Sequence, residues 1–551
     1  MGSETEYGIH APAEPGCNAT WLSTQVVHAY ALLAAEHAAG GAETRWDYTD
    51  EQPLADARGW TLDRSAAHPS QLTDADRFAD RPWGALGGAE SILTAAGVAL
   101  SDWQALDTAD PVEPPPRVSN MVLGNGARLY VDHAHPEYSS PEVIGPQAAL
   151  IWDFAGDVVA RQIVDDIDRR RQQVLNVGGS TESSEDALLP AVQLYKNNTD
   201  GKGASYGSHE NYLVPRAVPF RDLVTGLTPF FVTRPLICGS GRVGLGQDGS
   251  TPGFQISQRA DFFEAEVGLE TTIRRPIINT RDEPHAVAEK YRRLHVIVGD
   301  ANLSQVSHFL KFGSTALVLG LIERGLAPRL EFPDPVDALH TVSHDVGLSH
   351  RYRLNDGRRV SALDVQWMYW EVARQASAPD SDQQTEAVLR HWAQTLEGLA
   401  TGPAAVAGSV EWAAKLGLLQ QYRERDHLEW SDPRLALIDL QWADVRLDKG
   451  LANRLQTRGA LATLVPPSWI EAAVLNPPED TRAYFRGQFI RQFGAHVVGA
   501  SWDSVVVELA GRRRVQKIPT REPLRGTRAL TGELFDAQLE VEEFVSRLLG
   551  D

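Results

Sequence analysis

The chain has 551 residues, of which 42% are hydrophobic and 23% charged, and its formal net charge at pH 7 is -21. A chain of this length exceeds the usual size of a single hydrophobic core, so we expect a large domain and a smaller one. The negative charge argues against nucleic acid and anionic membranes as general partners, because the long-range field repels both.

Neither secretion nor membrane insertion is expected. The N-terminus, "MGSETEYGIH", has acidic residues where a signal peptide is basic and then apolar. The chain has no uncharged apolar run of about 18 residues, the length that a membrane-spanning helix needs. Only Cys17 and Cys238 are present, so no disulfide framework is expected. These features predict a cytoplasmic protein.

The N-terminal residues predict a strand followed by a helix. Alternation in "GSETEYGI" puts Glu4 and Glu6 on one face of the strand. Apolar residues at helical spacing follow within residues 23–41, where Ser23 or Thr24 is the predicted N-cap.

Residues 42–117 form a long insertion after this helix. Segments of this length in a compact enzyme are typically functional lids or disordered. Trp46, Tyr48 and Trp60 indicate that its first part is more than a linker. We expect the insertion to lie at the entrance of a site and to gate it.

The rest of the chain contains strand-like and helical blocks. "MVLGNGARLYVD" predicts a hairpin, a helix follows within residues 145–174, and residues 176–187 predict a loop. Strand-like pieces occupy residues 192–300 and include "FFVTRPLICGSG". Helices dominate from residue 303 to about 475, with a break at "SAPDSDQQ".

These blocks predict an α+β protein with a mostly antiparallel sheet covered by helices. Charged residues are expected to fill one face of that sheet. The proline-rich "NPPEDT" predicts a domain boundary, with a large domain over residues 1–478 and a small C-terminal domain over residues 479–551.

Two short motifs match well-known patterns without their structural context. "GSGRVG", from Gly239 to Gly244, fits the dinucleotide fingerprint but is followed by turn residues instead of a helix. "GASYG", from Gly203 to Gly207, fits the nucleophile elbow but lacks the strand before it and the helix after it. Neither a Rossmann site nor a serine hydrolase is therefore expected.

Ionisable residues recur at a period of two on several predicted strands. Arg128, Tyr130 and Asp132 share one strand face, and Glu137 lies just beyond. Residues of the same kind on the other strands are Glu4, Glu6, His209, Arg281 and His295. Carboxylates buried together repel one another unless cations neutralise them. Glutamates with one or two histidines suit Mg²⁺ or Mn²⁺, and arginines beyond them suit phosphate oxygens.

Most of these residues also have a purely structural interpretation. Glu4 and Glu6 fit the solvent-facing side of an edge strand. His209 fits a hydrogen-bonded structural histidine, and Arg281 fits an ion pair with the carboxylate of an adjacent residue. The recurrence on successive strands favours the functional interpretation.

Eight segments of the chain resemble the Pup ligase and depupylase family, which shares ancestry with glutamine synthetase. They are "ETEYGI", "NGARLYVDHAHPEYS", "YKNN", "YGSHENYL", "IINTRDEPHA", "KYRRLHVIVGDAN", "DVRLDKGL" and "ASWDSV". "DHAHPEYS" resembles the depupylase and deamidase branch, because the ligases have one more residue between the aspartate and "HPEY". The insertion with "RWDY" and "PLADARG" is similar to a loop that the ligases lack.

The resemblance implies a role for individual residues. Asp132 matches the catalytic aspartate, and Arg259 matches a position near the glutamate of the substrate. The metal-ligand positions are matched by Glu4, Tyr130 and Glu137 for one Mg²⁺, and by Glu6, His209 and His295 for a second ion. The nucleotide-contacting positions are matched by Arg128, Ser140 and Trp502, with Arg281 at the terminal phosphate.

The resemblance also implies a glutamine synthetase-like catalytic domain over residues 1–478, with Mg²⁺ and ATP, or ADP plus phosphate, as cofactors. Its partners would be Pup and pupylated proteins. The implied reactions are hydrolysis of the isopeptide bond between the C-terminal glutamate of Pup and a lysine, and deamidation of a C-terminal glutamine. Asp132 would be either the nucleophile or the general base.

Pup is acidic and disordered, so a basic docking groove that uses Arg292, Arg293, Arg351 or Arg353 is expected. Three rival functions are an ATP-consuming Pup ligase, a non-catalytic Pup-binding module and a metabolic enzyme that acts on small amino acids.

Overall fold

The computed structural model describes residues 1–14, 16–36, 45–67, 118–176, 190–377, 381–509 and 515–550. Its central element is a six-stranded sheet in the order β14-β9-β1-β7-β6-β5, and every neighbouring pair is antiparallel. The strands are β1 (Gly2–Glu6), β5 (Asn120–Val122), β6 (Arg128–Asp132), β7 (His135–Ser139), β9 (Ser208–Pro215) and β14 (Tyr291–Val296). This sheet and the helices around it confirm the predicted α+β class.

Helices cover one face of the sheet. They are α1 (Ala19–Glu36), α3 (Pro146–Asn176) and α6 (Gln305–Glu323), and α13 (Pro467–Leu475) packs against α3. The sheet residues Leu129 and Tyr138 face these helices in one apolar cluster, whereas their strand neighbours Arg128 and Glu137 point to the opposite face. The alternation therefore leaves the charged residues together on the other side of the sheet.

Helix α1 begins earlier than predicted. It starts at Ala19, where the Oδ1 atom of Asn18 accepts a hydrogen bond from the Trp21 amide at 3.1 Å. Ser23 and Thr24 therefore lie inside the helix, and their prediction as N-cap is wrong. The predicted end of this helix at residues 40–41 lies outside the described residues.

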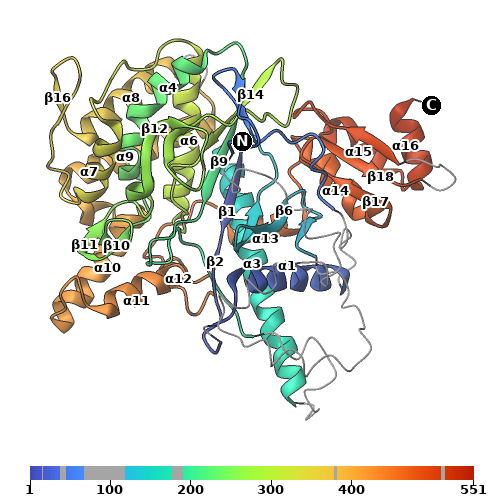
Figure 1. Ribbon diagram of the computed structural model, residues 1–551, viewed down its shortest axis with the longest axis horizontal. Coiled ribbons are helices and arrows are strands. Elements are labelled where there is room, and N and C mark those ends of the chain that lie inside the picture. Colours follow the sequence, from blue (N-terminus) through green and yellow to red (C-terminus); the bar gives the residue numbers. More distant parts are fainter. Residues whose placement is uncertain are drawn as a thin grey trace.

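A helical region stands beside the sheet (Figure 1). Its helices are α4 (Phe220–Thr233), α5 (Pro235–Cys238), α7 (Pro335–His344), α8 (Ala362–Ser377), α9 (Gln383–Thr401), α10 (Glu411–Asp426), α11 (Pro433–Trp442) and α12 (Leu451–Thr457), with 3-10 turns at Ala260–Phe262 and Pro403–Val406. Four small sheets accompany these elements: β10 (Arg242–Leu245) with β11 (Thr251–Gln255), β12 (Phe263–Gly268) with β13 (Arg275–Asn279), β15 (Tyr352–Arg353) with β16 (Arg359–Val360), and β2 (Gly8–His10) with β8 (Gln193–Tyr195). The predicted break near residue 380 separates α8 from α9 and is confirmed.

The prediction of strand for residues 230–241 is wrong. Residues 230–238 belong to the end of α4 and to α5, and they are buried on all sides. In a helix that is buried all round, apolar and polar residues do not alternate with a helical period. A short apolar run of this kind therefore resembles a buried strand in sequence. Helix α6 is long and apolar enough to span a membrane by composition, but 83% of its apolar window is buried inside the protein.

The C-terminal part, whose ribbon is red in Figure 1, has its own aromatic core. It contains α14 (Ala483–Phe493), β17 (Val497–Ala500), β18 (Ser504–Val507), β19 (Gln516–Pro519), α15 (Arg528–Asp536) and α16 (Val541–Leu549), with a 3-10 turn at Gly494–His496. Trp46 and Val122 join this core, so the small unit is docked on the sheet. The boundary at residues 478 and 479 stays a prediction.

The insertion is described only over residues 45–67, which include β3 (Ala55–Asp56) and β4 (Trp60–Thr61). Its remainder and the predicted loop at 176–187, apart from the last residue of α3, lie outside the described residues. Strand β10 follows "GSG" directly and strand β9 follows "GASYG", so both motifs lack the helix that they need.

Candidate active site

The register of the central sheet brings the ionisable residues together. Glu4 of β1 lies opposite His209 of β9, and Glu6 lies opposite Glu137 of β7. Glu137 in turn lies opposite Tyr130 of β6. Because side chains opposite one another across strands share a face, these residues form one continuous polar surface.

The first cluster contains Glu4, His209 and His295, whose ligand atoms all lie within 4.8 Å of one another. The Nδ1 atom of His209 lies 3.1 Å from Glu4 Oε2, and Asn211 donates a hydrogen bond of 3.0 Å to Glu4 Oε1. Asn211 Oδ1 also lies 3.0 Å from His295 Nδ1. Sequence reasoning missed Asn211, although it follows His209 by two residues on the same strand face.

Charges around this cluster set its protonation. Burial raises the pKa of Glu4, but the hydrogen bond to His209 and the positive charge of Arg293 outweigh it, so the pKa lies well below its usual value. Burial and the charge of Arg293 lower the pKa of His295 well below its usual value. An ionised carboxylate beside a neutral imidazole is a donor set that suits a divalent cation.

The second cluster contains Glu6, Asp132 and Glu137, whose carboxylate oxygens lie within 4.8 Å of one another. Glu6 also accepts a hydrogen bond of 2.7 Å from the Gly207 amide. Burial and the nearby charges of Asp132, Glu4 and Glu6 raise the pKa of Glu137 well above its usual value. Three carboxylates this close need a positive charge between them, so the cluster fits Mg²⁺ or Mn²⁺.

This grouping differs from the predicted one. The family positions paired Glu4 with Glu137, and Glu6 with the two histidines, whereas the structure exchanges the two glutamates. The cause is the sheet register, since Glu4 lies opposite His209 and Glu6 lies opposite Glu137. Tyr130 lies beside the second cluster, and burial and the charge of Glu137 raise the pKa of its phenol well above the usual value.

Asp132 ends β6 at a tight turn, in which His133 has a φ of 53°. The Nδ1 atom of His133 lies 2.8 Å from Asp132 Oδ2. Burial raises the pKa of Asp132, but the hydrogen bond and charge of His133 outweigh it and lower the pKa. Because the Asp132 side chain is 32% exposed, an ionised carboxylate faces the open side of the site.

Residues of the insertion surround Arg128. The guanidinium lies over the rings of Trp46 and Tyr130, at 4.0 and 3.8 Å from their centroids. It donates hydrogen bonds of 3.0 Å to the hydroxyl of Tyr48 and to Oδ1 of Asn120. Trp46 also contacts Trp502 edge to face, with ring centroids 5.1 Å apart. The structure thus brings Arg128 and Trp502 together through the insertion.

Ser140 and Arg281 have different surroundings. The Ser140 hydroxyl is buried, accepts a hydrogen bond of 2.9 Å from the Ser3 amide and lies 3.3 Å from the Pro141 carbonyl. The Nε atom of Arg281 is buried and has no hydrogen-bond partner among the described residues.

The structural interpretation of Arg281 is not supported. Its neighbour Asp282 pairs with Arg216, and Glu283 lies 3.5 Å from Arg293. Among the described residues, no ion pair joins Arg281 to either acid.

Arg259 is 1% exposed and lies among main-chain carbonyls. It donates to Ile297 O, and to Gly299 O at 3.3 Å. Burial and the charge of Arg275 lower its pKa to about 9. Arg275, which the sequence analysis did not identify, donates 2.7 Å to Ser205 O. In the part of the chain that the structure describes, neither arginine has an ion-pair partner, so the pair suits a substrate carboxylate.

The prediction that Arg292 and Arg293 line a docking groove is wrong. Arg292 is buried and donates 2.9 Å to Val218 O. Arg293 lies inside the first cluster, 3.7 Å from Glu4 Oε1. Both side chains are therefore held by contacts inside the protein and do not line an exposed groove.

The site and the fold agree with comparisons to known proteins. The family model described as Pup-ligase protein matches residues 1–506. A depupylase of Acidothermus cellulolyticus is 49% identical over 100% of this chain and 99% of its own length. A Pup deamidase/depupylase of Mycolicibacterium smegmatis is 48% identical over 100% of this chain and 99% of its own length. The chain belongs to the Pup-ligase protein family, as its resemblance predicted.

Within this family, Pup–protein ligases match a smaller part of the chain by sequence than the two depupylases do. A Pup–protein ligase of Mycolicibacterium vanbaalenii is 42% identical over 68% of this chain and 80% of its own length. The solved complex between Pup and its ligase PafA has a TM-score of 0.72 and 27% identity, and covers 99% of this chain and 93% of that one. The structure of PafA in complex with ADP has a TM-score of 0.68 and 33% identity, and it covers 80% of this chain and 94% of that one.

Proposed function

We propose that this protein is a depupylase and Pup deamidase. It would hydrolyse the isopeptide bond between the C-terminal glutamate of Pup and a substrate lysine, and convert a C-terminal glutamine of Pup to glutamate. The observation that carries the proposal is the ionised Asp132 beside Glu6 and Glu137 on the charged face of the sheet. The full-length relatives bear the names of these two activities.

The two clusters are the proposed metal sites. Glu4, His209 and His295 would hold one divalent cation, and Glu6 with Glu137 would hold a second beside the phenol of Tyr130. When bound, such cations supply a positive charge that binds phosphate oxygens and polarises a carbonyl group.

The proposed nucleotide contacts are Arg128, Trp502 and Arg281. Nucleotide binding is supported by the ADP complex of the relative PafA. Arg128 lies over the ring of Trp46, which in turn contacts Trp502, so aromatic surface and positive charge are adjacent, as a nucleotide requires. Arg281 would donate its buried Nε–H group, which has no hydrogen-bond partner in the described part of the chain, to a phosphate oxygen. Ser140, which follows β7, is the fourth proposed nucleotide contact and rests on the family resemblance.

The proposed substrate contacts are Arg259 and Arg275, which would bind the carboxylate of the terminal residue of Pup. Asp132 would then promote hydrolysis at the carbonyl carbon in the side chain of that terminal residue, where the C–N bond breaks and the amine leaves. As nucleophile, Asp132 forms an anhydride that water hydrolyses; as general base, it removes a proton from the attacking water. Single-turnover hydrolysis in H₂¹⁸O distinguishes these, because only the anhydride route can place the label on Asp132.

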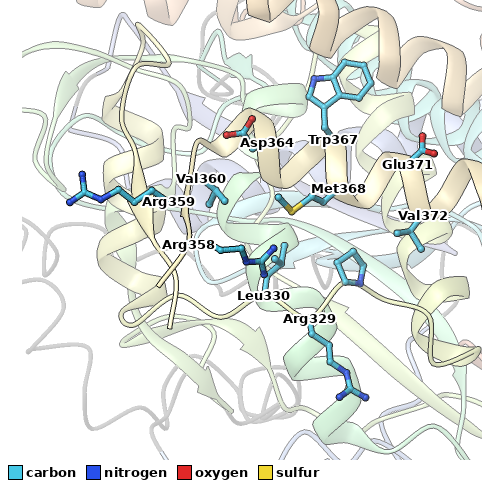
Figure 2. Close-up of a pocket in the computed structure, with 11 residues that line it drawn as sticks. Arg329, Leu330, Arg358, Arg359, Val360, Asp364, Trp367, Met368, Glu371 and Val372 are labelled. Atoms are coloured by element: carbon cyan, nitrogen blue, oxygen red, sulfur yellow. The ribbon is translucent and has the colours of Figure 1, made fainter. Parts of the chain in front are cut away.

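A second groove, which none of the cluster residues lines, contains three arginines and two acids (Figure 2). Its volume is about 810 Å³, and its residues are Pro328, Arg329, Leu330, Arg358, Arg359, Val360, Asp364, Trp367, Met368, Glu371 and Val372. Arg353 lies directly opposite Arg359 in the β15–β16 hairpin. Like charges in this position destabilise a hairpin, and neither arginine has an ion-pair partner among the described residues.

We therefore propose that acidic Pup docks at this groove. Arg353 and Arg359 would make the contacts that were predicted in part for Arg292 and Arg293. The groove combines three arginines, against the two acids Asp364 and Glu371, with apolar side chains such as Trp367, in a protein whose net charge is -21. The arginines and the apolar side chains complement an acidic segment that carries a few apolar residues.

Mass spectrometry of Pup and of a pupylated protein tests the function. The purified protein is incubated with Mg²⁺ and with ATP, with ADP plus phosphate, or without nucleotide. We expect release of intact Pup, with a free lysine on the target, and a mass increase of about 1 Da for Pup that ends in glutamine, in both nucleotide reactions. Formation of new conjugates without release would instead assign the protein as a ligase, and binding without either reaction would assign it as a binding module.

A further inference from the structure

A buried charged network lies behind the strand that carries Glu4 and Glu6. Lys196 follows β8 in the "YKNN" segment, and its ammonium group lies 2.7 Å from Asp153 Oδ2 and 2.9 Å from Asp157 Oδ2. The side chains of the three residues are at most 4% exposed. Both aspartates belong to α3, which packs on the helix-covered face of the sheet.

The same two aspartates bind the N-terminal strand through their other oxygens. Asp153 Oδ1 accepts a hydrogen bond of 3.1 Å from the Thr5 hydroxyl, and Asp157 Oδ1 accepts one of 2.8 Å from the Tyr7 hydroxyl. Each carboxylate therefore connects Lys196 to β1 or to the residue that follows it.

The network faces the opposite side of β1 from the two clusters. Thr5 lies between Glu4 and Glu6, so its side chain points toward the helices when theirs point to the site. The two glutamates belong to two different clusters, and their like charges repel each other across one residue of strand. A flexible strand would relieve that repulsion by twisting or shifting, and the ligand atoms would then separate.

We propose that Lys196, Asp153 and Asp157 are positioning residues that hold β1 in the register and orientation that both metal sites require. The inference rests on the metal-binding role proposed for Glu4 and Glu6. Lys196 contacts both buried carboxylates, whereas His308 contacts only Asp153, at 3.2 Å, so a neutral residue at position 196 would remove the ammonium group that the two carboxylates share. Hydrogen-bond partners of metal ligands typically change affinity by about 10- to 100-fold when they are lost.

The test is direct binding of Mn²⁺, measured from the electron paramagnetic resonance signal of free Mn²⁺ in the presence of the full-length protein. We expect Lys196→Met to weaken binding by about 10-fold or more at the tighter of the two sites. Thermal unfolding recorded in parallel separates loss of affinity from loss of fold. This readout requires neither Pup nor nucleotide, so it can fail independently of the proposed hydrolysis.

Lys415→Met is the matched control. Lys415 is 1% exposed and lies 2.7 Å from Asp439, but it belongs to α10, away from the sheet. We expect this variant to lose stability as Lys196→Met does and to bind Mn²⁺ with wild-type affinity. Equal weakening in both variants would mean that any buried charge loss disturbs the site, and would overturn the inference.

A milder pair of substitutions covers the case in which Lys196→Met does not fold. Thr5→Val with Tyr7→Phe removes both hydrogen bonds to the aspartates and leaves the Lys196 ion pairs in place. We expect at least threefold weaker Mn²⁺ binding. Wild-type affinity in this double variant, or in folded Lys196→Met, would overturn the inference. A wild-type protein that binds no Mn²⁺ would overturn the metal assignment and the inference together.

Discussion

Glu142 connects the C-terminal unit to the large domain. It precedes α3 and accepts hydrogen bonds from Arg482 Nε at 2.7 Å and from Arg486. Arg486 also donates 2.8 Å to Gly126 O, in the turn between β5 and β6, and 3.1 Å to Trp502 O. Replacing Glu142 by glutamine would therefore leave two buried arginines without their shared carboxylate.

The size of the effect follows from the pKa of Glu142. Burial raises this pKa, but the charges of Arg486 and Arg482 outweigh it and lower the pKa from 4.5 to about 2. Such a shift corresponds to about 3 kcal/mol of stability. Because the folded pKa lies below the unfolded one, the contribution is complete above about pH 4.5 and is lost as the pH falls toward 2.

Urea unfolding followed by tryptophan fluorescence measures this contribution. The signal is the summed emission of the 14 tryptophans, which follows global unfolding, and it includes Trp502, whose ring centroid lies 4.9 Å from the guanidinium of Arg486. We expect Glu142→Gln to lower the unfolding free energy by about 2–3 kcal/mol at pH 7. The difference from wild type should narrow as the pH falls from 5 to 3, because Glu142 becomes protonated in the unfolded chain near pH 4.5 but stays ionised in the folded protein until about pH 2.

Glu479→Gln is the control, because its ion pair with Arg528 is more than half exposed on both sides and contributes at most about 1 kcal/mol. If Glu142→Gln lowers the unfolding free energy no more than Glu479→Gln does, Glu142 does not stabilise the contact with Arg482 and Arg486. A difference from wild type that stays constant between pH 5 and 3 would lead to the same conclusion.

Three further predictions concern nucleotide, Pup and metal. Tyr48→Phe removes the partner of Arg128 at 3.0 Å and should raise the nucleotide Kd about tenfold in a fluorescence titration, whereas an unchanged Kd would remove the insertion from the nucleotide site. Combined Arg353→Glu and Arg359→Glu should raise KM for a pupylated substrate about tenfold with little change in kcat; an unchanged KM rules out the groove. Chelation by EDTA should stop Pup release until Mg²⁺ is restored, and full activity without metal would exclude both metal sites.

Local sequence pattern predicted the charged face of the sheet. Glu4 and Glu6 on one strand, and Arg128 and Asp132 on another, follow from a period of two, which depends only on backbone geometry. The partners across strands depend on sheet register, which joins residues far apart in the chain. For this reason the pattern predicted which residues share the charged face but not which of them lie together, and the structure places Glu4 rather than Glu6 beside His209.

Other features depended on tertiary contacts that no local signal contains. Trp46 and Tyr48 lie about 80 residues before Arg128, and only the fold shows that they surround it. Residues 230–238 are helical but buried all round, so they carry no helical period. The segment "YKNN" carries part of the family resemblance, but the burial of Lys196 behind β1 depends on contacts with α3 that the segment itself does not contain.

The most direct test of the account is Pup release by Asp132→Asn. Asparagine keeps the size of the side chain but can neither attack a carbonyl carbon nor accept a proton at neutral pH. With a pupylated protein, nucleotide and Mg²⁺, we predict that release falls by at least about 100-fold while Pup and nucleotide bind with near wild-type affinity. A variant that releases Pup at the wild-type rate would contradict the assignment of Asp132 as the reacting carboxylate.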